Sequence, residues 1–144
     1  MLVLKNISFK ANKGDTVAFI GSTGSGKSTL VNLIVRFYDV TDGEILIDGV
    51  NIKDYKLEYL YKLIGYVPQR AVLFNGTVNS NISYGEAMEK ISDKKIVEAS
   101  KVAQADEFIS KMDDGYESHI AQGGTNISGG QKQRIAISRA IAKN

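Results

Sequence analysis

The stretch GSTGSGKST, residues 21–29, decides how the rest of the chain is interpreted. It fits the pattern G-x-x-x-x-G-K-[ST], which describes a loop that wraps phosphate groups. Glycines let the backbone take positive φ angles and approach phosphate oxygens without a Cβ in the way. The N–H groups of such a loop converge on the phosphates, and the dipole of the following helix adds to the attraction. The stretch therefore predicts a nucleotide phosphate site.

The side chains and the surroundings of this loop support the same prediction. Lys27 would place its ammonium on the β- and γ-phosphates, and the Ser28 hydroxyl is a ligand for Mg²⁺. TVAFI, residues 16–20, predicts a buried parallel strand before the loop. Residues 28–38 predict a helix after it, since apolar residues recur at helical spacing at Leu30, Leu33, Ile34 and Phe37. The pattern alone leaves kinases, GTPases and transport ATPases open.

The composition restricts the class of protein without identifying it. The chain has 144 residues, 43% of them apolar, which suits a single domain or part of a larger one. Its net charge of +2 gives no reason to expect a nucleic-acid partner, so phosphate binding must come from local geometry. There is no cysteine, and the single histidine, His119, is expected to be a surface or hydrogen-bonded residue rather than a metal ligand. No apolar run is long enough to span a bilayer.

The rest of the chain reads as a strand-rich amino half and a helix-rich carboxyl half. Residues 2–10 and 64–68 predict further strands, and residues 44–52 predict a hairpin that turns at Asp48-Gly49. Helical patterns follow in residues 56–63, 77–85 and 93–112. The apolar stripe of the last segment is formed by Ile96, Val97, Ala99 or Ser100, Ala103 and Phe108.

A second glycine element lies near the end of the chain. SGGQ, residues 128–131, precedes KQRIAISRAIAKN, which predicts a helix with Ile135 and Ile141 facing a core. A serine hydroxyl, free N–H groups and a helix dipole together make an anion site. An ordinary serine-capped helix has the same residues, and the element alone favours that interpretation.

Taken together, the motifs resemble those of ABC transporter ATPases. NISGGQKQR resembles the family's signature motif with isoleucine in place of leucine, GSTGSGKST is similar to its Walker A loop, and GYVPQR resembles its Q-loop, which implies a role for Gln69. RFYDVTDGEILIDGVNIKD resembles the connecting stretch of exporters. AQGGTN, residues 121–126, matches the loop before the exporter signature, in a form similar to subunits of heterodimeric exporters.

The resemblance implies an α/β fold with a P-loop NTPase core and an ABC-type helical subdomain, with ATP and Mg²⁺ as cofactors. In this family two nucleotide-binding domains pair head to tail, as homo- or heterodimers, and each ATP lies between the Walker A loop of one and the signature of the other. Lys27 and Gln69 would then be catalytic, and Ser28 and Gln69 would contact Mg²⁺. The implied nucleotide-binding residues are Gly21, Ser22, Thr23, Gly24, Ser25, Gly26, Lys27, Ser28, Thr29, Gln69, Ser128, Gly129, Gly130 and Gln131.

The same resemblance implies a division of the chain and a membrane partner. Residues 1–70 would form the P-loop core portion, residues 71–135 the helical subdomain, and residues 136–144 the start of the return to the core. Residues Arg70 to Phe74, together with the helical segment, would dock the cytoplasmic loops of a transmembrane domain at the cytoplasmic face of the membrane. Phe74 and its neighbours could equally belong to the local core.

Other elements of the family pattern are absent from the sequence. The Walker B strand, whose acidic residues hold Mg²⁺ and polarise the attacking water, would follow the signature helix. We therefore expect a partial nucleotide-binding domain, truncated before that strand, which binds phosphate weakly and hydrolyses little or no ATP. Two other functions stay open: an ABC-family ATPase of translation or DNA repair, and a non-catalytic interaction module that binds nucleotide.

Overall fold

The computed structural model describes residues 4–85 and 91–143. The chain divides into two compact units, Met1–Tyr61 and Lys62–Asn144. None of the helices in the described ranges combines the length and the hydropathy that a membrane crossing requires. The sequence predicts a different division, at residue 70, between the P-loop core portion and the helical subdomain. That division stays a prediction.

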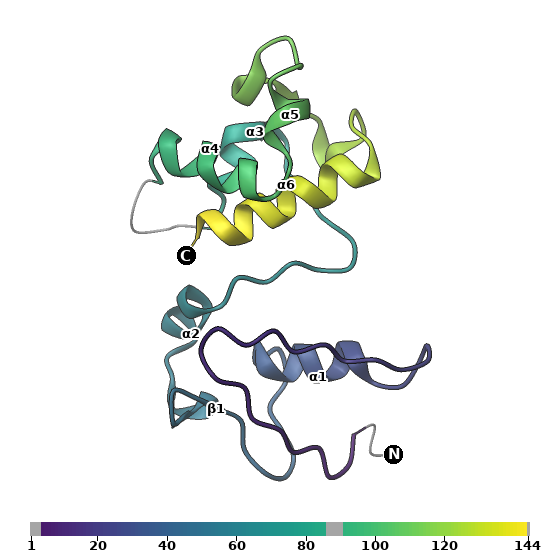
Figure 1. Cartoon of the computed structure of the whole chain (residues 1–144), viewed down its shortest axis with the longest axis vertical. Coiled ribbons are helices and arrows are strands. Elements are labelled where there is room, and N and C mark those ends of the chain that lie inside the picture. The colour runs from purple at the N-terminus through teal and green to yellow at the C-terminus, as the bar shows by residue number, and fades with distance from the viewer. Residues whose placement is uncertain (1–3, 86–90, 144) are drawn as a thin grey trace. The chain divides into compact units, whose positions relative to one another are not determined.

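The first unit is built around one helix and one short hairpin (Figure 1). Strands β1 (Leu46–Ile47) and β2 (Val50–Asn51) pair antiparallel, with Ile47 opposite Val50. Asp48 and Gly49 turn the chain with φ angles of 52° and 79°, the left-handed pair that a two-residue hairpin needs. The predicted hairpin is confirmed. The unit also contains helix α1 (Lys27–Ile34), the 3₁₀ turn η1 (Ile52–Asp54) and the start of α2 (Leu57–Leu63).

Three predicted strands are wrong, so the amino half has fewer strands than the sequence suggested. Residues 16–20, 64–68 and 4–10 lie outside any strand, while residues 2 and 3 lie outside the described part of the chain. Val17 is 46% exposed and Ile20 96% exposed, so the run predicted to be buried faces solvent. A strand exists only when its N–H and C=O groups pair with a neighbour, and no neighbouring strand pairs with these runs among the described residues.

The predicted helix after the glycine loop forms, but it ends earlier than its apolar stripe. Helix α1 stops at Ile34, and Arg36 takes a left-handed φ of 56°. The Arg36 guanidinium holds this conformation by donating to the carbonyl oxygens of Ile52 at 3.0 Å and Tyr55 at 3.1 Å. Phe37 therefore lies beyond the helix and is 49% exposed, contrary to the prediction. The stripe residues Leu30, Leu33 and Ile34 are half-buried.

The second unit is a helical body with one short strand pair. Helices α3 (Val78–Ile82) and α4 (Asp93–Val102) pack along α6 (Gly129–Ala142), and α5 (Asp106–Ile109) follows α4 (Figure 1). The predicted helices at residues 77–85 and after residue 128 are thus confirmed. The helix predicted over 93–112 is broken: α4 ends at Val102, Gln104 takes a left-handed φ of 57°, and α5 begins only at Asp106. Two more 3₁₀ turns, η2 (Gly115–Glu117) and η3 (Gln122–Gly124), connect them. The hydrophobic core consists of Leu73, Val78, Ile82, Ile91, Ile96, Ala99, Ala103, Ala105, Ile109, Ile120, Ile135 and Ala142.

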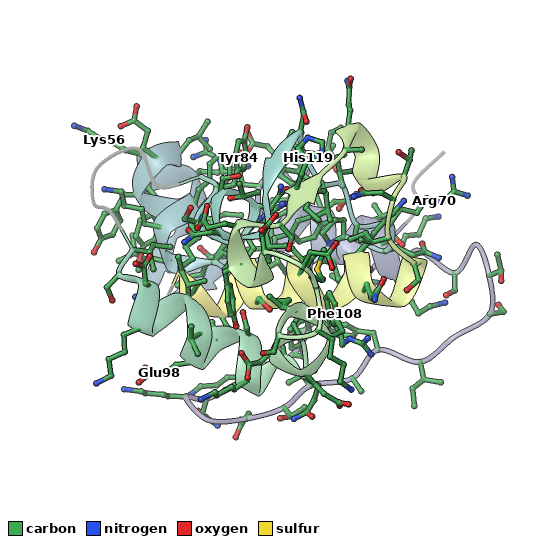
Figure 2. The ribbon with its side chains drawn as sticks, turned by 90° about the horizontal axis from the view of Figure 1, so that it is seen from above. Lys56, Arg70, Tyr84, Glu98, Phe108 and His119 are labelled. Carbon is green, nitrogen blue, oxygen red and sulfur yellow. The ribbon has the colours of Figure 1, made fainter. Side chains whose placement is uncertain are left out.

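The apolar stripe predicted for residues 93–112 is confirmed. Ile96, Ala99, Ser100 and Ala103 are buried, and Val97 is half-buried. Phe108, labelled in Figure 2, is half-buried as well. The Arg134 guanidinium lies 5.1 Å from its ring centre. The sequence did not predict strands β3 (Gly76–Thr77) and β4 (His119–Ile120), which pair antiparallel. This pair fastens the segment after Gln69 to the segment before the signature motif.

Candidate functional site

The ammonium of Lys27 lies against its own loop in the first unit. Its Nζ donates hydrogen bonds to the carbonyl oxygens of Gly21 and Ser22, both at 2.7 Å, and to Oγ of Ser25 at 3.2 Å. The loop from Gly21 to Lys27 is therefore closed into a ring by one cationic side chain. A phosphate placed in this ring would meet a positive charge that is already inside the loop.

The glycines of this loop are required by its geometry. Gly24 and Gly26 have φ angles of 83° and 92°, which L side chains rarely adopt. A Cβ added at Gly21 would lie 2.7 Å from Oγ of Ser25, so the Ser25 side chain would have to move to make room for it. The backbone can thus come as close to a ligand as the phosphate-site prediction needs.

The start of α1 leaves its first N–H groups without a side-chain cap. Gly26 is the N-cap residue, in a left-handed conformation, and no side chain caps the helix. The first four N–H groups of a helix have no partner inside it, and they carry the positive end of the helix dipole. Ser28 is exposed and Thr29 half-buried in this first turn. The loop and the helix start fit a phosphate group, and the Ser28 hydroxyl is a hard oxygen ligand of the kind that Mg²⁺ prefers.

Gln69 belongs to the second unit and is exposed in a bend after Pro68. In the residues that follow, exposure alternates: Leu73 is buried, whereas Val72 and Phe74 are 55% and 40% exposed. Phe74 therefore lies at the surface, and Leu73 is the core residue of this segment. The predicted docking role of Arg70 to Phe74 stays a prediction.

Two residues that the sequence did not single out hold this segment in place. Asn81 is buried, and its side chain accepts from the Phe74 N–H at 2.8 Å and donates to the carbonyl oxygens of Phe74 at 2.9 Å and Thr77 at 3.0 Å. Arg139 of α6 donates from Nε to the carbonyl oxygen of Asn81 at 2.7 Å and from Nη1 to that of Val72 at 3.1 Å.

Arg139 also lies under an aromatic pair. Phe74 and Tyr84 stack with their ring centres 4.1 Å apart, and the guanidinium carbon lies 5.6 Å from each centre. Burial lowers the pKa of the Arg139 guanidinium, and the nearby Tyr84 opposes this shift. The sequence offered one signal for Arg139: it lies four residues after the core residue Ile135. Residues four apart lie on the same face of a helix, so Arg139 could have been placed on the buried face.

The second glycine element is a capped helix start in the second unit. Oγ of Ser128 accepts from the Gln131 N–H at 3.2 Å, and Oε1 of Gln131 accepts from the Ser128 N–H at 2.9 Å. This capping box matches the structural interpretation that the sequence left open. Gly129 and Gly130 are exposed, and a Cβ added at either would meet nothing within 4 Å. The helix start is therefore also open to an approaching group.

His119 is exposed on β4, where its Nε2 lies 2.9 Å from Oδ1 of Asn75. Asn126 fastens the next loop by donating to the His119 carbonyl at 2.8 Å and accepting from the Ala121 N–H at 3.0 Å. Across residues 4–85 and 91–143, no group of three or more His, Cys, Asp or Glu side chains could hold a metal ion.

The predicted site residues thus lie in two units. Residues 21–29 form one arrangement, and Gln69 lies in the same unit as residues 128–131.

Comparison with known proteins covers nearly the whole chain. A family model described as ABC transporter matches residues 4–144. An ATP-dependent lipid A-core flippase of Pasteurella multocida is 50% identical over 141 residues, which is 98% of this chain and 24% of the relative. ABC transporter B family member 14 of Arabidopsis thaliana is 48% identical over 143 residues, 99% of this chain and 11% of the relative.

A solved structure is also similar. The structure of a bacterial Atm1-family ABC exporter with ATP bound superposes with a TM-score of 0.79 at 41% identity, over 85% of this chain and 21% of that one. The chain spans about a quarter or less of the length of these relatives.

Proposed function

The chain belongs to the ABC transporter family, and from this premise we propose that it binds MgATP through residues 21–29 as part of the ATP-hydrolysing subunit of an exporter. Membership confirms the resemblance that the motifs indicated, together with the α/β class of the P-loop core. The relatives named above include a flippase and an exporter solved with ATP, which supports the choice of transport over translation or DNA repair.

The observation that carries the proposal is the closed ring of the glycine loop. The Lys27 ammonium is held by the carbonyls of Gly21 and Ser22, next to a helix start that no side chain caps. A triphosphate would offer this ammonium stronger, charge-assisted partners than neutral carbonyls, and it would fill the open N–H groups of α1. Both changes favour the nucleotide-bound form.

The finer roles follow the predictions from the sequence. Ser28 and Gln69 would supply oxygen ligands to Mg²⁺, and Gln69 would orient the attacking water. Ser128, Gly129, Gly130 and Gln131 would bind the γ-phosphate of the ATP held by a second nucleotide-binding domain, so that ATP joins the two domains. A transmembrane domain would dock on residues 70–74, at the cytoplasmic face of the membrane. That this chain by itself hydrolyses little or no ATP stays a prediction.

The test is binding of a fluorescent ATP analogue with Mg²⁺, with phosphate release followed in the same samples. Replacing Lys27 by alanine removes a charge-assisted contact, so we expect affinity to fall about ten- to a hundredfold. Lys10→Ala is the matched control, because Lys10 is an exposed lysine outside the loop. Equal binding by the parent chain and Lys27→Ala would refute the proposed site. Turnover that depends on Lys27 would refute the prediction of inactivity.

A further inference from the structure

The third hydrogen-bond partner of the Lys27 ammonium is a side chain. An ammonium carries three hydrogens. Nζ of Lys27 donates to the carbonyl oxygens of Gly21 and Ser22, both at 2.7 Å, and to Oγ of Ser25 at 3.2 Å. These three acceptors take up all three hydrogens. Ser25 is the one of them that contributes a side-chain atom, so it is the one partner that a substitution can remove.

The loop is built so that the Ser25 hydroxyl reaches the ammonium. The backbone N–H of Ser25 donates to the Ser22 carbonyl oxygen at 3.2 Å, which holds the serine in a turn. Its neighbours Gly24 and Gly26 both have positive φ angles. A Cβ added at Gly21 would lie 2.7 Å from Oγ of Ser25, so the absence of a side chain at Gly21 leaves room for this hydroxyl. The contact between Ser25 and Lys27 therefore follows from the shape of the loop.

The hydroxyl contact is the weakest of the three. It is the longest, and its acceptor belongs to an exposed side chain that can rotate, whereas the two carbonyls are fixed in the backbone. A phosphate oxygen is charged and accepts a stronger hydrogen bond from an ammonium than a neutral hydroxyl does. A bound triphosphate would therefore take the third donor of Lys27 from Ser25 before it takes the other two.

We infer that Ser25 is a positioning residue, whose hydroxyl holds the third donor of Lys27 before nucleotide binds and gives it up to a phosphate oxygen. The inference rests on the proposed function, in which residues 21–29 bind MgATP. The hydroxyl stabilises the nucleotide-free loop, so it lowers the affinity for nucleotide, which is the opposite of what a phosphate ligand does. It acts only through the Lys27 ammonium and contacts no reacting atom.

The test is equilibrium binding of a fluorescent ATP analogue with Mg²⁺ to the 144-residue chain and its variants. We expect Ser25→Ala to raise the affinity about threefold to fivefold, because the nucleotide-free form loses one hydrogen bond. Ser25→Thr keeps a hydroxyl and should bind as the parent chain does. Ser8→Ala, which removes an exposed hydroxyl outside the loop, is the matched control.

A double-mutant cycle tests whether the effect passes through Lys27. In the Lys27→Ala background there is no ammonium to hold, so adding Ser25→Ala should leave the affinity unchanged. A fall in affinity when Ser25→Ala is made in the parent chain would mean that the hydroxyl binds phosphate or only shapes the loop, and it would overturn the inference. An equal gain in both backgrounds would overturn it as well, because the effect would then not need the ammonium.

A failure of the proposed function gives a different result. If the parent chain and Lys27→Ala bind equally, the proposed site is refuted, and the role of Ser25 is refuted with it. Binding that depends on Lys27 but is unchanged in Ser25→Ala refutes only the role of Ser25. If circular dichroism shows that Ser25→Ala disturbs the fold, Ser25→Cys, whose thiol is a weak acceptor, decides in its place.

Discussion

Helices α1 and α6 both begin after a glycine-rich stretch, yet their first turns are built differently. Helix α1 starts at Gly26 in a left-handed conformation with no side-chain cap, and none of its residues is fully buried. Helix α6 starts at Ser128 with a reciprocal capping box, and it buries Ile135, Ala136, Ser138 and Ala142. The start of α1 has no side-chain cap, whereas side chains cap two backbone donors at the start of α6 and leave Gly129 and Gly130 exposed.

The difference shows that a glycine-rich helix start can leave its N–H groups free to bind a ligand, or can cap them and so stabilise the helix. The uncapped N–H groups of α1 are available to an anion, whereas the capping box of α6 satisfies two backbone donors within the chain. A partner's phosphate at α6 would therefore meet donors that are already in part occupied. This contrast leads us to expect that α1 depends on ligand for its stability and that α6 depends on its core.

The strongest test of the contrast is to remove one core side chain from α6. Ile135 is fully buried, so Ile135→Ala should lower the free energy of unfolding of the second unit by about 2–5 kcal/mol. The matched change on α1, Leu30→Ala at a half-buried position, should cost about 1 kcal/mol. Urea titration followed by circular dichroism, with amide exchange to assign the loss to a unit, measures both. Equal losses would contradict the contrast.

A smaller effect is expected from adding a methyl group to a glycine of each element. Gly24 has a φ of 83° and open space around its Cβ position, so Gly24→Ala isolates the backbone cost, about 1–2 kcal/mol. Gly129 lies within α6 with nothing near its Cβ position, so Gly129→Ala should be neutral or should stabilise by less than about 1 kcal/mol. The opening free energies of the amides in each first turn, from hydrogen exchange, report both. A cost at Gly129 as large as that at Gly24 would refute this expectation.

The last expected effect concerns the cap itself. Ser128→Ala removes the acceptor for the Gln131 N–H and should destabilise α6 by about 1 kcal/mol, in the lower part of the range for such caps. Ser128→Asp keeps an acceptor oxygen at the same position and should recover most of the loss. The same urea titration measures this difference. If alanine and aspartate were equally tolerated, the capping box would contribute nothing to the stability of the helix.

Local patterns could be predicted from the sequence because neighbouring residues determine them. The turn at Asp48-Gly49 needs only two residues that accept left-handed angles, and the stripe of α4 needs only helical spacing. The glycine loop is of the same kind, since its shape follows from Gly24, Gly26 and one lysine. The functional motifs of this chain are therefore easier to find than its architecture.

Pairing between distant segments could not be predicted. Arg139 reaches Asn81, 58 positions away, and Val72, 67 positions away, and neither contact leaves a periodic signal. Strands β3 and β4 are two residues each, too short for an alternating pattern. The strand predicted at residues 16–20 is wrong for the same reason. Its apolar residues favour an extended strand, but a strand forms only where a neighbouring strand pairs with it.

The ring that Lys27 closes has a consequence for the rate of nucleotide binding. Because the ammonium already lies on the carbonyls of Gly21 and Ser22, an arriving triphosphate competes with an internal occupant. Binding is then an exchange of partners rather than a simple collision, and the release of the lysine is an intramolecular step. At high nucleotide concentration the observed association rate should level off at the rate of that release, whatever the identity of the base.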